Sequence, residues 1–188
     1  ERQPETAWRL ARILKPHGES VDKATLKKFG ALAARELRAD SPRQEALLYL
    51  LRNCNSHTAD AVLREVGLHW KKQRKWARAV ACLKQLQRSE AFDDGLRFEL
   101  AICDLKQSPK DIAPHLRAED YALRGLQPLV ANKKFKLLER LKKEKALDAT
   151  DLFYVGFHFS EGLGDEQRFG RAVLEYVAKR WPASKEGK

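Results

Sequence analysis

The chain has 188 residues, and its 37 lysines and arginines outnumber 26 aspartates and glutamates, so its formal net charge is +11. Hydrophobic residues make up 43% and charged residues 34%, a balance that is typical of a folded globular protein and excludes a disordered one. No apolar run approaches the roughly 20 residues of a membrane-spanning helix. No glycine-rich phosphate loop, HExxH motif or metal-ligand spacing indicates an enzyme, a cofactor or a metal site.

The N-terminal part of the sequence predicts three helices. Pro4 suits the first turn of the first helix, and Ser20 can cap the second, which runs to about residue 38. The third begins at Ser41, where Ser, Pro and Gln stand at the spacing of a helix start with a capping box. The inward side of the second helix carries Leu26, Phe29, Gly30, Ala33 and Leu37.

The most regular stretch runs from residue 63 to residue 91, and Thr58 can cap its first helix. Apolar residues follow helical spacing on both sides of residues 71–75, which are wholly polar and predict a turn. Gly67 and Ala79 are small residues on the inward sides of the two helices, where they let the backbones approach closely. We therefore predict a tight antiparallel helix pair, with Trp70 and Trp76 filling the space beside the small residues.

The middle of the chain predicts one helix and one irregular segment. The helix begins at Asp93 or Asp94, either of which can cap it, and it ends before Pro109. Pro114 and Pro128 are expected to keep the segment between residues 110 and 130 short and irregular, because proline disrupts a helix interior.

Three helices are predicted for the remaining residues. The first covers residues 133–145, and the second begins after Asp148 or Thr150. The last runs from about residue 166 to residue 180 and ends before Trp181 and its following proline.

The pattern of the 63–91 stretch recurs in these last two helices. Leu152, Val155, Gly156 and Phe159 repeat the spacing of Leu63, Val66, Gly67 and Trp70, and Phe169, Ala172 and Tyr176 repeat that of Trp76, Ala79 and Leu83. Gly67 and Ala79 are 12 residues apart but Gly156 and Ala172 are 16 apart, so the second loop is expected to be four residues longer. We predict that Gly67, Ala79, Gly156 and Ala172 are buried at helix–helix contacts.

This pattern resembles the tetratricopeptide repeat, which places Leu-Gly, two aromatic residues and an alanine at these intervals. Units 60–91 and 149–182 carry the resemblance best, and unit 22–52 carries it more weakly. The family implies an all-α fold in which antiparallel helix pairs stack as a superhelical α-solenoid with a concave surface. We expect residues 1–188 to form one such domain, as part of a longer protein. A HEAT-like array is the alternative, because degenerate repeats of both kinds look alike in sequence.

The resemblance also implies a function, that of a non-enzymatic scaffold or adaptor that holds a peptide or a partner domain in its concave face. In tetratricopeptide arrays the ligand contacts outward-facing polar residues on the first helix of each pair. Carried onto this sequence, these partner-binding candidates are Glu65, His69, Lys72, Tyr154 and His158.

Two basic clusters suggest a second function, the binding of nucleic acid or another polyanion. One surrounds the predicted turn at 71–75, and the other lies on the predicted 133–145 helix, where spacing places three side chains on one face. The polyanion-binding candidates are Lys71, Lys72, Arg74, Lys75, Arg78, Lys136, Arg140 and Lys143. A solvated basic surface would give the same pattern. A third alternative is an accessory domain of a larger enzyme.

The cysteines indicate the compartment. Cys54, Cys82 and Cys103 are an odd number at wide spacing, which favours buried free thiols in a reducing environment over disulfides. We therefore expect a cytoplasmic protein. A nucleophilic pair of Cys54 and His57 lacks any recognisable orienting acid or oxyanion hole.

Overall fold

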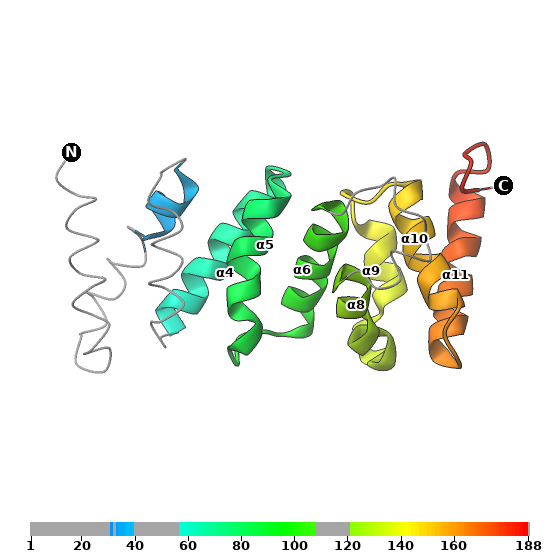
Figure 1. Ribbon diagram of the computed structural model, residues 1–188, viewed down its shortest axis with the longest axis horizontal. Coiled ribbons are helices and arrows are strands. Elements are labelled where there is room, and N and C mark those ends of the chain that lie inside the picture. The colour runs from blue at the N-terminus through cyan, green and yellow to red at the C-terminus, as the bar shows by residue number, and fades with distance from the viewer. Residues whose placement is uncertain (1–30, 32, 40–56, 108–120, 188) are drawn as a thin grey trace. The chain divides into compact units, whose positions relative to one another are not determined.

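The computed structural model describes residues 31, 33–39, 57–107 and 121–187. All regular elements in these ranges are helices, which confirms the predicted all-α class (Figure 1). The chain divides into two compact units, Glu1–Asp93 and Asp94–Lys188. Predictions for Leu26, Phe29, Gly30 and residues 40–56 lie outside the described residues. None of the described helices is both long and apolar enough to span a membrane.

The described part of the first unit comprises a helical segment at residues 33–38, α4 (His57–Lys72), α5 (Trp76–Gln85) and the 3-10 helix η1 (Leu86–Arg88). Helix α4 already includes His57, so the prediction that Thr58 caps it is wrong. The connection to α5 is the predicted polar turn, and Arg74 adopts a left-handed conformation there with a φ of 58°.

Helices α4 and α5 pack as an antiparallel pair around small residues. A Cβ atom on Gly67 would lie 2.7 Å from Leu83 Cδ2, so only glycine fits there without displacing the leucine. Trp70 lies about one turn nearer the loop and contacts Lys75 and Arg78 at the start of α5. The end of α4 therefore lies beside the start of α5, as in an antiparallel pair. Gly67 and Ala79 are buried as predicted, whereas Trp76 is only half-buried. Burial of Leu83 and Trp70 supplies several kcal/mol of hydrophobic stabilisation, about 1.5–3 for each large side chain.

The second unit comprises six described helices. These are α6 (Asp94–Gln107), α8 (Tyr121–Ala131), the 3-10 helix η2 (Lys133–Phe135), α9 (Leu137–Lys143), α10 (Ala149–Ser160) and α11 (Asp165–Arg180). Sequential neighbours form the closest pairs, α6 with α8 and α10 with α11 (Figure 1). Helix α10 begins after Asp148, one of the two predicted caps. The Asp148 side chain accepts a hydrogen bond from the backbone amide of Asp151 in a capping box. The last helix also matches its predicted range.

Two predictions about the extent of helices in the second unit are wrong. Pro128 lies within helix α8 instead of breaking it. The proline is exposed, so the backbone carbonyl that it leaves without an amide donor can be hydrated. The predicted helix 133–145 is divided in two, because Lys136 adopts a left-handed conformation with a φ of 51° between η2 and α9.

Helices α10 and α11 pack even more closely than α4 and α5. A Cβ atom on Gly170 would lie 2.2 Å from the backbone nitrogen of Ser160, and one on Gly156 would lie 2.8 Å from Leu174 Cγ. Gly156 is buried as predicted, but Ala172 is only half-buried, so its predicted burial is wrong. Gly170 takes its place on the contact side of α11.

The contacts explain this error in the helix register. Gly67 meets Leu83, and Gly156 meets Leu174, so the two pairs align with a loop that is two residues longer in the second pair rather than four. In this alignment Gly170 stands four residues before Leu174, just as Ala79 stands four residues before Leu83.

An ion pair with little solvent exposure joins α6 to α10. The side chain of Lys106, 13% exposed, donates to the carboxylate of Asp151, 0% exposed, across 2.7 Å. The same carboxylate oxygen accepts the backbone amide of Asp148 across 3.0 Å. Separating the two charges in a buried site would be costly. The ion pair therefore holds α10 in position against α6.

Candidate interaction surfaces

The three partner-binding candidates on α4 have different surroundings. Glu65 is exposed and forms an ion pair with Arg38. His69 is half-buried, accepts a 3.0 Å hydrogen bond at Nε2 from the side-chain amide of Gln73, and lies edge-on to Trp70 at 5.4 Å. Lys72 is exposed at the end of the helix. Helical spacing places these three candidates along one side of α4.

The basic cluster at the α4–α5 turn is partly used by the fold. Lys75 Nζ lies 4.8 Å from the centre of the Trp70 ring, and the Arg78 guanidinium lies 5.0 Å from it. Both contacts are of the cation–π kind, which stabilises the helix pair. Lys72 and Arg74 are exposed, whereas Lys71 is half-buried. Lys75 is exposed as well, so this turn keeps positive charge at its surface while two of its basic residues also contact Trp70.

The two partner-binding candidates on α10 differ in exposure. Tyr154 is buried with 8% of its surface exposed, so the prediction that it faces outward is wrong. His158 is half-buried and lies edge-on to Phe159, with the ring centres 4.9 Å apart. Burial lowers the pKa of His158, and the carboxylates of Glu166 and Glu161 oppose that effect in part. The side chain is therefore neutral at pH 7.

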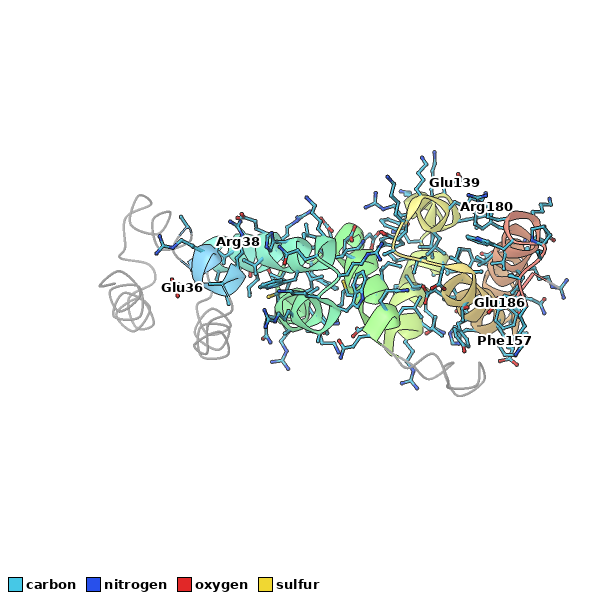
Figure 2. The ribbon with its side chains drawn as sticks, turned by 90° about the horizontal axis from the view of Figure 1, so that it is seen from above. Glu36, Arg38, Glu139, Phe157, Arg180 and Glu186 are labelled. Atoms are coloured by element: carbon cyan, nitrogen blue, oxygen red, sulfur yellow. The ribbon has the colours of Figure 1, made fainter. Side chains whose placement is uncertain are left out.

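An aromatic pair on the same helix was not recognised in the sequence. The rings of Phe153 and Phe157 stack with their centres 6.0 Å apart and their planes at 28°. Both residues are half-buried, and neither belongs to the core cluster of the second unit nor packs against it as Phe169 does. Figure 2 shows Phe157 and Glu139 at opposite edges of this unit. The sequence does indicate this pair, because the two phenylalanines are four residues apart and lie off the apolar stripe of α10.

The basic residues around α9 differ in backbone conformation and in their partners. Lys136 precedes the helix, in its left-handed conformation, and is exposed. Arg140 donates to Glu99 across 3.1 Å, and its guanidinium lies 5.4 Å from the centre of the Phe98 ring, so it fastens α9 to α6. Lys143 is exposed. Arg140 is nevertheless 53% exposed, so all three residues of this predicted triad reach the surface, Arg140 with an acidic partner.

A groove with a volume of about 490 Å³ opens among α8, α9 and the first turns of α11, with Asn132 and Lys136 from the connection between α8 and α9. Apolar side chains of α8, α9 and α11 line it, among them Leu129, Val130, Leu138 and Phe169. Charged side chains also line it, namely Lys136, Glu139, Asp165 and Arg168. An apolar lining beside charged groups is a common arrangement in sites that bind peptides or small molecules.

The described residues contain no group of three or more His, Cys, Asp or Glu side chains that could hold a metal ion. Cys82 and Cys103 are buried free thiols, as the sequence predicted. Burial raises the pKa of Cys82 to about 12, so this thiol is protonated and unreactive at neutral pH. Cys54 and the side chain of His57 lie outside the part of the chain that the structure describes.

Comparison with known proteins found no match to this chain among protein-family models, curated proteins or solved structures.

Proposed function

We propose that the chain is a non-enzymatic interaction module built from tetratricopeptide-like helix pairs, and that it binds a peptide or a segment of a partner domain. The contacts around Gly67, Gly156 and Gly170 support this proposal, because small residues at closely packed helix pairs are what the repeat pattern requires. The outward side of α10 is the proposed binding surface. It corresponds to the first helix of a pair, which carries ligand contacts in the family that the sequence resembles.

The Phe153–Phe157 stack is the observation that carries the proposal. Phenylalanine side chains contribute to stability mainly by burial, yet these two are only half-buried and lie outside the core cluster. Aromatic residues on a protein surface are enriched at the centres of interfaces, where they lose their remaining exposure to water. His158 stands beside Phe157 in the sequence and adds a neutral hydrogen-bonding ring to this surface.

The structure changes which of the sequence candidates belong to the proposal. Tyr154 is excluded by its burial, and Glu65 already has a partner in Arg38. His158 on α10, and His69 and Lys72 on α4, keep enough exposure to take part. We expect Phe153 and Phe157 to contribute most of the binding energy, since aromatic anchors typically do.

A selection from a display library of random peptides tests this proposal. Peptides enriched on the wild-type protein are synthesised with a fluorescent label, and their affinity is measured by anisotropy for the wild type and for the Phe153→Ser/Phe157→Ser variant. We expect the variant to bind at least about tenfold more weakly, because each lost anchor is worth more than about 1 kcal/mol.

Leu163 provides the matched control, since it is another apolar residue of the second unit and is 86% exposed in the α10–α11 loop. Leu163→Ser should leave the affinity unchanged. Circular dichroism of each variant establishes that the helices are intact. Equal binding by the wild type and the double variant would remove α10 as the binding surface, and a selection that enriches no peptide would contradict the proposal as a whole.

A further inference from the structure

The groove among α8, α9 and α11 is separate from the proposed α10 surface. Glu139 lines the groove, and Phe157 belongs to the α10 surface; these two residues lie at opposite edges of the unit (Figure 2). Its volume of about 490 Å³ is enough for a few apolar side chains of a peptide. Leu138 and Phe169 line it and are only partly buried, although both pack against the core cluster. The groove therefore offers an apolar lining that is supported by the fold.

The acidic groups that line the groove are already paired with basic ones. Glu139 accepts a hydrogen bond from Lys142 across 2.9 Å, and Asp165 accepts one from Arg168 across 2.8 Å. The hydrogen bond from Lys142 holds the pKa of Glu139 below its ordinary value, so the carboxylate is ionised at neutral pH. Each of these two pairs is neutral overall and adds little net charge to the groove.

The lysines around the groove, in contrast, carry surplus positive charge. Lys136 lines the groove and is exposed, and no acid among the described residues forms an ion pair with it. Lys134 and Lys143 near it in the sequence are exposed too, and neither has an ion pair within the described ranges. Lys136 is held at the groove by its left-handed backbone, which ends η2 and begins α9.

From this combination we infer that the groove binds an acidic amphipathic peptide segment, one in which Leu or Phe side chains alternate with Asp or Glu. The apolar side chains enter the groove against Leu138 and Phe169, and a carboxylate pairs with Lys136. Charge complementarity selects the acidic peptide, because the native acids are neutralised and the surplus charge is positive. A nucleic acid would use the lysines but leave the apolar lining unfilled. This inference goes beyond the proposed function, since it assigns a second surface and the chemistry of its partner.

An array of synthetic peptides of about twelve residues tests the inference. One set combines Leu and Phe with Asp and Glu, a second set replaces the acids by Lys, and a third replaces Leu and Phe by Ser. Binding is measured by fluorescence anisotropy with the full chain. We expect only the first set to bind, and we expect its affinity to fall as salt is added. Binding of the Lys set, or equal binding of the Ser set, would overturn the inference.

A charge reversal locates the site. Lys136→Glu should weaken binding of the acidic set by about threefold to tenfold. The change replaces an exposed ion pair between Lys136 and a peptide carboxylate by repulsion between two carboxylates. Lys145→Glu is the matched control, because Lys145 is an exposed lysine that does not line the groove. It should change the affinity less than about twofold. Equal losses in both variants would mean diffuse attraction by the basic surface and would overturn the assignment to the groove.

Two further measurements separate this surface from the alternatives. The Phe153→Ser/Phe157→Ser variant should bind the acidic set as the wild type does; a loss there would move the acidic peptide to the α10 surface and refute the groove. A fluorescent single-stranded oligonucleotide serves as the competing polyanion. If it displaces the acidic peptide completely and binds more tightly, the basic residues serve nucleic acid and the inference fails.

Discussion

Gly170→Ala is the substitution that tests the packing of α10 on α11 most severely. The added Cβ atom would lie 2.2 Å from the backbone nitrogen of Ser160, 2.5 Å from the carbonyl carbon of Phe159 and 2.7 Å from the carbonyl oxygen of Gly156. All three are backbone atoms, so no side-chain rotation relieves the contact. The two helices must separate by about 1 Å to reach an ordinary contact distance, and this opens a packed core.

The expected magnitude follows from two opposing effects. Overpacking of a core typically costs about 1–3 kcal/mol, and a clash with backbone belongs at or above the upper end of that range. Alanine in a helix interior gains about 1 kcal/mol over glycine. We therefore expect Gly170→Ala to lower the free energy of unfolding by at least about 2 kcal/mol.

Gly125→Ala is the matched control within the same unit. Gly125 also lies in a helix interior, but a Cβ atom there would meet only the Cβ atom of Ala101 at an ordinary 3.5 Å. Helix propensity then dominates, and this variant should be more stable than the wild type by about 0.5–1 kcal/mol.

Urea denaturation followed by far-UV circular dichroism measures the change in stability of both variants. Hydrogen–deuterium exchange of peptides from residues 149–180 shows whether the change is local to α10 and α11. Shifts of the same sign and size in the two variants would show that the close contact at Gly170 does not exist and would refute the reasoning.

Three further substitutions or treatments test other contacts. Asp151→Ala should lower the free energy of unfolding by about 3 kcal/mol in the same urea assay, because the nearly buried Lys106 loses its 2.7 Å partner and keeps only the half-exposed Asp148 at 3.6 Å; a change below about 1 kcal/mol would contradict the buried pair. Pro128→Ala should raise that free energy by about 1–3 kcal/mol, since it restores a donor inside α8, and a less stable variant would show that proline is required there. Cys82 should resist iodoacetamide at pH 8 in the folded protein and react in urea, as read by mass spectrometry. The reason is that burial raises the pKa of Cys82 to about 12, so the folded state keeps a proton that the unfolded state releases. The free energy of unfolding should therefore fall as pH rises from about 9 towards 12. Rapid labelling of the folded protein would contradict this.

Local sequence patterns predicted those parts of the fold that depend on helix periodicity and capping. The stripe through Gly67 and Ala79 identified the contact side of α4 and α5, and Asp148 was among the predicted caps. The prediction for Ala172 is wrong because it equates Tyr176 with Leu83 on spacing alone, whereas Leu174 is the residue that meets Gly156. A difference of two residues rotates a helix by about 200°, so the spacing of Phe169, Ala172 and Tyr176 did not identify the contact side of α11.

Long-range contacts explain most of what the sequence did not predict about the surfaces. Arg140 lies in a basic run, but Glu99 and Phe98 from α6 hold it, and no local pattern shows that. The resemblance to the tetratricopeptide repeat predicts that Tyr154 faces outward. Tyr154 is nevertheless buried, so more of the surface of α10 is covered than its apolar stripe alone indicates.

The most direct test of the proposed function is an NMR titration of the full, ¹⁵N-labelled chain with a peptide enriched in the display selection. The account predicts saturable shifts of the backbone amides of α10 around Phe153, Phe157 and His158, with the amides of α5 unchanged. Shifts that are absent at saturating peptide, or that follow the exposed lysines without involving α10, would contradict the claim that this chain is a peptide-binding module with its binding surface on α10.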